Sequence, residues 1–216
     1  MIAFLCVAGA VGTFIAWRIV VVRHASVWGV MAVVTGALGL LSLATGELTI
    51  VGHVGWAWAV GVGVASGLAI YAATAIFVLI VRHWPAMDRR VADVYDLRKG
   101  LGLLTALLLV AGVYGPGEEL FWRGLVQGTI SDELTPAAGA LLSWLAYIVV
   151  NAASGSLAIT AGAVVAGALW TLLAFWSGGV LASILCHTIW TGLMLALPPG
   201  GSHRHAGPGL DSAAPP

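Results

Sequence analysis

The chain has 216 residues, of which 60% are hydrophobic and 8% are charged, and its formal net charge is zero. A soluble domain carries about 25% charged residues, so this composition, with a mean hydropathy of +1.01, excludes a soluble fold and indicates a polytopic membrane protein. The nine Lys and Arg residues form no basic patch, so we expect the lipid bilayer and not nucleic acid as a partner.

Apolar segments long enough to cross a bilayer, which takes about 20 residues, follow one another along the chain. They predict an all-α bundle of about seven transmembrane helices, near residues 2–22, 27–46, 54–81, 100–129, 137–153, 157–176 and 178–197. We interpret residues 1–197 as a single transmembrane domain. Residues 198–216 are rich in Pro, Gly and Ser, which predicts a disordered C-terminal tail.

Basic residues mark the orientation of these helices. Arg18 and Arg23 precede the first connection, and four arginines and a lysine lie in the third connection, residues 82–100. The positive-inside rule places both connections in the cytoplasm and the N-terminus outside. The third connection is either a short interfacial helix or a charged linker.

The run Glu118-Glu119-Leu120-Phe121-Trp122-Arg123 places three charges inside an apolar segment. Each charge at membrane depth costs about 2.5 to 3.5 kcal/mol on insertion scales, so such groups need a partner or a function. Glu119 and Arg123 are four residues apart, so on a helix they share a face and can pair. Glu118 lies about 100° away around the helix, and we expect its carboxylate to remain free.

The residues before this run, Gly115-Pro116-Gly117, weaken a helix. Proline removes a helix hydrogen bond and clashes with the preceding turn, while glycine loosens the backbone. We therefore expect the helix to break or kink here, with Glu118 near the start of a new helical piece.

Two further polar residues, Asn151 and His187, lie deep in later apolar segments. Together with the charged run they resemble the CAAX-protease and bacteriocin-processing (CPBP, or Abi) family of glutamic-type intramembrane proteases. That family has the motifs Glu-Glu-x-x-x-Arg, Phe-x-x-x-His and His-x-x-x-Asn. The first is intact here, the second reads Tyr147 to Asn151, and the third reads His187 to Thr191. The resemblance covers residues 100–197, which it implies are the catalytic core.

The resemblance implies that Glu118 activates a water molecule that attacks a peptide carbonyl. It implies that Glu119 and Arg123 form a supporting pair, that His187 donates to the oxyanion, and that Thr191 steadies His187 or the water. Asparagine can donate and accept hydrogen bonds but cannot shuttle a proton. Asn151 therefore leaves two readings: a branch that works with asparagine, or a site that has lost peptidase activity.

The resemblance implies a peptide or protein substrate at the membrane, in the plasma membrane of a bacterium. No cofactor or metal is expected, because the site offers one imidazole and no His-Glu-x-x-His spacing occurs. Two alternatives remain: a non-catalytic scaffold or bacteriocin-immunity protein, and a small proton-coupled transporter. The seven predicted segments show no repeat, so they lack the paired halves that many transporters show, which argues against the transporter.

Overall fold

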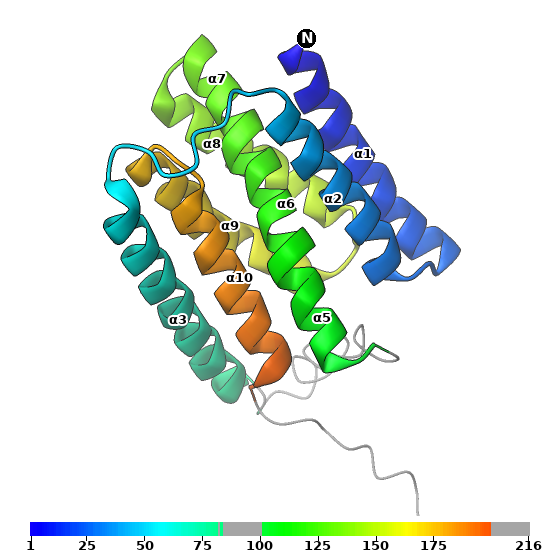
Figure 1. Cartoon of the computed structure of the whole chain (residues 1–216). Coiled ribbons are helices and arrows are strands. Elements are labelled where there is room, and N and C mark those ends of the chain that lie inside the picture. The colour runs from blue at the N-terminus through cyan, green and yellow to red at the C-terminus, as the bar shows by residue number, and fades with distance from the viewer. Residues whose placement is uncertain (82, 84–100, 200–216) are drawn as a thin grey trace, which may run out of the picture.

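The computed structural model describes residues 1–81, 83 and 101–199 as a bundle of helices (Figure 1). Six long helices of the bundle are each a single α-helical element: α1 (Ile2–Arg23), α2 (Val27–Ala44), α3 (Gly55–Val81), α8 (Pro136–Ala152), α9 (Leu157–Ser177) and α10 (Leu181–Ala196). The seventh, which we call the central helix, comprises α5 (Leu103–Leu109), η1 (Val110–Tyr114), α6 (Gly115–Glu119), η2 (Leu120–Val126) and α7 (Gln127–Glu133). For the described residues, the predicted all-α bundle of seven helices is confirmed.

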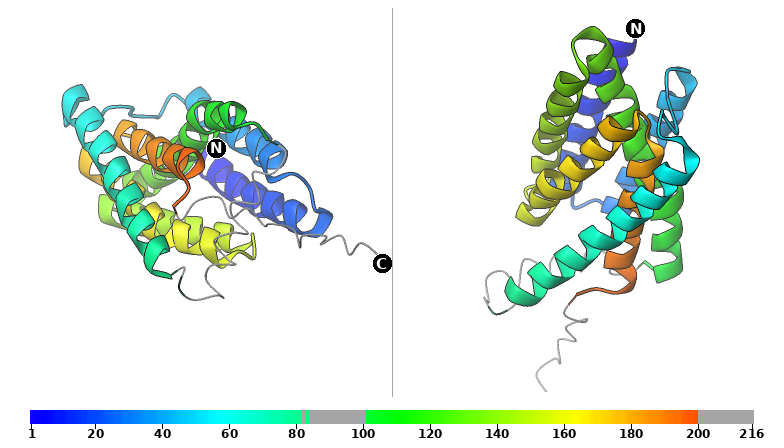
Figure 2. Two further views of the ribbon diagram at one scale, coloured as in Figure 1. Left: turned by 90° about the horizontal axis from the view of Figure 1, so that it is seen from below. Right: turned by 90° about the vertical axis from the view of Figure 1, so that its left-hand side faces the viewer.

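The bundle has the length and surface of a membrane-spanning protein. Five of these helices are long and apolar enough to cross a bilayer, whereas α8 and α10 are shorter, at 17 and 16 residues. Large hydrophobic side chains such as Phe4, Val33 and Trp58 are exposed on the outside of the bundle, where lipid would cover them. The chain is therefore a multi-pass membrane protein, and α3 lies at one side of it with α1 and α2 at the other (Figure 2).

Capping residues set several of the helix ends. Ser26, Thr135 and Ser156 precede α2, α8 and α9, and the hydroxyl of each accepts a backbone N–H from the first turn. Gly178 ends α9 in the left-handed conformation, at φ 69°, which a residue without Cβ adopts at little cost. These local signals explain why the helix positions follow the sequence prediction closely.

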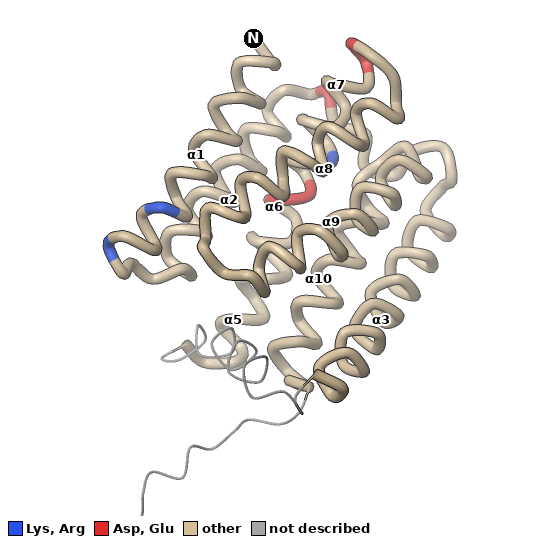
Figure 3. Tube along the Cα trace, turned by 180° about the vertical axis from the view of Figure 1, so that it is seen from behind, with Lys and Arg blue, Asp and Glu red and all other residues tan. Residues whose placement is uncertain are grey.

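Charged residues occupy distinct places in the bundle. Arg23 lies in the last turn of α1 and Arg18 five residues before it, whereas the two glutamates of α6 lie in the middle of the bundle (Figure 3). The predicted interfacial helix or linker at residues 82–100 and most of the predicted tail at residues 198–216 lie outside the described residues.

The central helix is continuous at Gly115-Pro116-Gly117, so the predicted break there is wrong. Tyr114 and Gly115 both have helical backbone angles. The turn before the proline is π-helical, and in it the Gly115 N–H donates to the Val110 carbonyl five residues earlier. This wider turn accommodates the proline, whose ring would clash with the carbonyl four residues earlier in a regular α-helix. Glu118 consequently lies in mid-helix and not at a helix start.

Glycines bring α2 and α6 into backbone contact. A Cβ added at Gly39 would lie 2.8 Å from the Gly117 Cα, and one added at Gly117 would collide with the Thr35 carbonyl oxygen. Close approach through small residues is a common mode of packing between membrane helices. This contact holds the segment that carries Glu118 and Glu119 against α2.

We expect Gly117→Ala to destabilise the protein by about 1–3 kcal/mol, because a new methyl group would be forced against backbone that cannot rotate away. Gly112→Ala is the matched control, since a Cβ at Gly112 meets nothing within 4 Å. Thermal unfolding in detergent measures the difference. Equal melting temperatures for the two variants would contradict the close contact of α2 and α6.

Small residues also seat α10, the helix of His187, against α3. A Cβ at Gly63 would lie 2.7 Å from the Ala182 carbonyl oxygen, and one at Gly67 would lie 2.9 Å from the Ile189 Cβ. The start of α10 is fixed by the connection between α2 and α3, because the Leu181 N–H donates to the Ile50 carbonyl at 2.8 Å. These contacts fix the position of α10, and with it His187, along the central helix.

Candidate functional site

The two glutamates lie at the middle of the central helix. Glu118 lies fifteen positions from each end of that helix, Leu103 and Glu133, which corresponds to about 22 Å at 1.5 Å per residue. Glu119 is completely buried and Glu118 is half-buried. The acidic pair is therefore far from both ends of the central helix.

Glu119 is paired with Arg123, as the four-residue spacing predicts. The Arg123 Nη1 lies 3.3 Å from the Glu119 Oε1, and neither side chain is exposed. Arg123 also donates from Nη2 to the Gly167 carbonyl at 3.0 Å and from Nε to the Thr171 hydroxyl at 3.4 Å. The guanidinium therefore links the central helix to α9.

His187 contacts the same glutamate. Its Nδ1 lies 2.8 Å from the Glu119 Oε1, and its ring stacks on Trp170 with centroids 3.7 Å apart and planes inclined by 10°. An ionised carboxylate only accepts hydrogen bonds, so Nδ1 carries the hydrogen in this contact. Nε2 is left as the ring nitrogen available to a substrate, and it can donate only when the ring is protonated.

Glu118 has a different partner, which corrects the expectation of a free carboxylate. The Tyr147 hydroxyl donates to the Glu118 Oε2 at 2.7 Å. The other oxygen, Oε1, makes no hydrogen bond within the described part of the chain. Sequence reasoning treated Tyr147 only as an altered motif position, although its hydroxyl in place of phenylalanine was a signal that it could bind a carboxylate.

Neither Asn151 nor Thr191 hydrogen-bonds to a glutamate within the described residues. The Asn151 side-chain amide donates to the Tyr147 carbonyl of its own helix at 2.9 Å, so its oxygen is the group left for a water or substrate. The Thr191 hydroxyl is buried and has no hydrogen-bond partner among the described residues, and neither has that of Thr188. Both hydroxyls lie within about one turn of His187 on α10.

Aromatic rings enclose Glu118, Glu119, Arg123 and His187, which we call the polar cluster. Trp122 packs edge-on against Tyr147 at 5.5 Å between centroids, and Trp190 packs edge-on against Trp170 at 5.6 Å. The Arg123 guanidinium lies 4.4 Å from the centroid of the Tyr147 ring. These apolar surroundings strengthen every electrostatic contact inside the cluster. No group of three or more His, Cys, Asp or Glu side chains placed for a metal ion occurs in the described residues.

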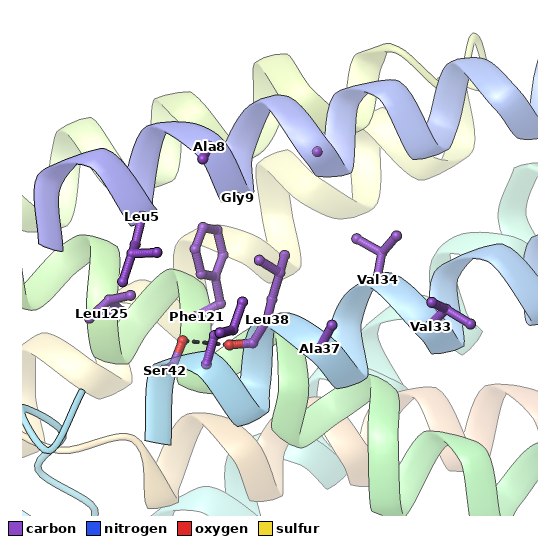
Figure 4. A pocket seen from close by; sticks show the side chains of 12 residues that line it. Leu5, Ala8, Gly9, Val33, Val34, Ala37, Leu38, Ser42, Phe121 and Leu125 are labelled. Atoms are coloured by element: carbon purple, nitrogen blue, oxygen red, sulfur yellow. Dashed lines mark hydrogen bonds between the residues drawn. The ribbon is translucent and has the colours of Figure 1, made fainter. Parts of the chain in front are cut away.

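An apolar cavity of about 280 Å³ lies between α1 and α2, where two residues of η2 also line it (Figure 4). Phe121, from the charged run, points into it between the two helices. Its lining is otherwise aliphatic apart from Ser42, whose hydroxyl donates to the Leu38 carbonyl at 2.8 Å. The cavity therefore holds no group for acid–base chemistry and is distinct from the cluster around Glu118.

Comparison with known proteins supports the resemblance. Residues 100–193 match the family model described as type II CAAX prenyl endopeptidase Rce1-like. Searches of curated proteins and of solved structures found no match. The family match confirms the resemblance to the CPBP family over the segment that carries all three motifs. By its description, the match supports a CAAX-type intramembrane protease at the level of the family.

Proposed function

We propose that the chain is an intramembrane endopeptidase of the CPBP type that cleaves a peptide or protein substrate in the plasma membrane. The observation that carries this proposal is the different state of the two adjacent glutamates. Glu119 is fully buried, with one oxygen shared by Arg123 and His187. Glu118 is half-buried and is held through one oxygen by a neutral phenol. One carboxylate is suited to a supporting role and the other to chemistry.

On this proposal Glu118 is the general base. Its Oε1 takes a proton from a water molecule, and the resulting hydroxide attacks the carbonyl carbon of the scissile peptide bond. The C–N bond then breaks, and the proton on Glu118 passes to the leaving amine, which restores the carboxylate. General base catalysis of this kind contributes about 10²- to 10⁴-fold to the rate.

His187 is proposed to stabilise the oxyanion of the tetrahedral intermediate. With Nδ1–H donated to Glu119, a protonated ring presents Nε2–H to the developing negative charge. A single oxyanion donor contributes about 2.7–4 kcal/mol in enzymes where it has been removed. Trp170, stacked on the imidazole, fixes the ring plane. The Thr191 hydroxyl and the side-chain amide oxygen of Asn151 are available to hold the water.

The membrane depth of the cluster restricts the substrate. Backbone polar groups without partners are costly in a bilayer, so the scissile segment must reach Glu118 through the protein and not through lipid. A peptide with an apolar or lipid-modified end meets this requirement, and a prenylated CAAX peptide is the first probe because of the name of the matched family.

The proposal is tested by comparing protein termini in membranes that contain the chain and in membranes that lack it. In water enriched in ¹⁸O, the proposal predicts new C-terminal carboxylates that carry one ¹⁸O atom, in endogenous proteins or in an added farnesylated CAAX peptide. If no new terminus forms in either pool, the endopeptidase proposal fails and the non-catalytic scaffold takes its place.

A further inference from the structure

The second motif brings an unassigned hydroxyl to the proposed base. Where the family pattern has phenylalanine, this chain has Tyr147, and its hydroxyl lies 2.7 Å from the Glu118 Oε2. We propose that Tyr147 is a positioning residue that orients the Glu118 carboxylate and keeps it separate from Arg123. This inference rests on the proposed function, since it assigns a role in preparing the same base.

The Tyr147 ring is itself held in place on several sides. The residue is 5% exposed, and its ring packs edge-on against Trp122 and Trp170, with centroids 5.5 and 6.4 Å away. A Cβ added at Gly167 would lie 3.1 Å from the Tyr147 Cδ1. A side chain with its rotamer fixed by packing holds its hydrogen-bond partner in one orientation.

The two ends of Tyr147 address different charges. The Arg123 guanidinium lies over the ring face, 4.4 Å from the centroid, while the hydroxyl donates to Glu118. Arg123 is in turn bound to Glu119, Gly167 and Thr171. Tyr147 thus contacts Arg123 through its ring face and Glu118 through its hydroxyl. As a result, the cation pairs with Glu119 alone, and Glu118 keeps Oε1 for a water molecule.

Asn151 supports this arrangement from the next turn of α8. Its amide donates to the Tyr147 backbone carbonyl at 2.9 Å and is 5% exposed. Both positions at which the second motif departs from the family pattern therefore lie on one face of α8. The polar group that this motif directs at Glu118 is the Tyr147 hydroxyl.

The test is Tyr147→Phe, which removes one oxygen and preserves the ring contacts. We expect kcat to fall about 10- to 100-fold, because a hydrogen bond to a charged group contributes this much free energy. KM should stay within about twofold, because on this proposal Tyr147 does not contact the substrate. Tyr71→Phe is the matched control: it removes a hydroxyl that donates to the Leu197 carbonyl at 2.8 Å, away from the cluster, and kcat should not change.

A second measurement does not depend on proteolysis. Dicyclohexylcarbodiimide modifies protonated carboxyl groups in apolar surroundings, and mass spectrometry locates the adduct. Without the tyrosine hydroxyl, the ionised form of Glu118 loses a donor, so Glu118 should be modified faster in Tyr147→Phe than in wild type or Tyr71→Phe.

The outcomes separate the two proposals. Faster modification in a protein that cleaves no peptide would support the positioning role and contradict the proposed function. Unchanged modification, together with unchanged kcat in a protein that needs Glu118 for cleavage, would overturn the positioning role and leave the proposed function intact.

Discussion

Glu118→Gln is expected to reduce peptide cleavage by about 10²- to 10⁴-fold, the range that a general base contributes. Glutamine has nearly the shape of glutamate, and its carbonyl oxygen can still accept the Tyr147 hydroxyl, but it cannot take a proton from water. The fold and KM should therefore be unchanged. The measurement is kcat and KM on a cleaved peptide in liposomes, with the melting temperature of each variant.

Glu133→Gln is the matched control for this change. Glu133 is an exposed residue of the same type at the end of the same helix, so the substitution should leave kcat within about twofold, as surface substitutions normally do. A Glu118→Gln protein that cleaves as fast as the Glu133→Gln protein would exclude Glu118 as the base.

Arg123→Ala is expected to have the largest effect on stability. The substitution leaves the buried Glu119 with His187 as its remaining partner, and breaking a buried ion pair on one side typically costs about 3–5 kcal/mol. It also removes the donors to the Gly167 carbonyl and the Thr171 hydroxyl and empties the space over the Tyr147 ring. We expect a lower yield of folded protein in the membrane and a reduced melting temperature.

A second substitution separates charge from packing in this prediction. Adding Glu119→Gln to Arg123→Ala removes the buried charge that has lost its arginine, so the double variant should be more stable than Arg123→Ala alone, in a non-additive way. Arg18→Ala, at an exposed position near the end of α1, is the control for loss of an arginine as such. A double variant no more stable than the single one would show that packing, and not the charge on Glu119, determines the loss.

The membrane helices could be predicted from the sequence because their cause is local. A run of about 20 apolar residues forms a helix in a bilayer whatever surrounds it, since every backbone group must be satisfied within the segment. The Glu119–Arg123 pair follows from the same regularity, because residues four apart share a helix face. The predicted break at Gly115-Pro116-Gly117 does not occur, because a π-helical turn accommodates the proline and the backbone stays helical.

The sequence by itself determined the class of fold, the seven helices and the residues from which a site could be built. Only the tertiary structure decided how these residues are shared: His187 contacts Glu119 instead of facing Glu118, and Tyr147 holds Glu118. The physical reason is that these contacts join residues 68 and 29 positions apart in the chain. They depend on how α8 and α10 pack against the central helix, which hydropathy does not encode.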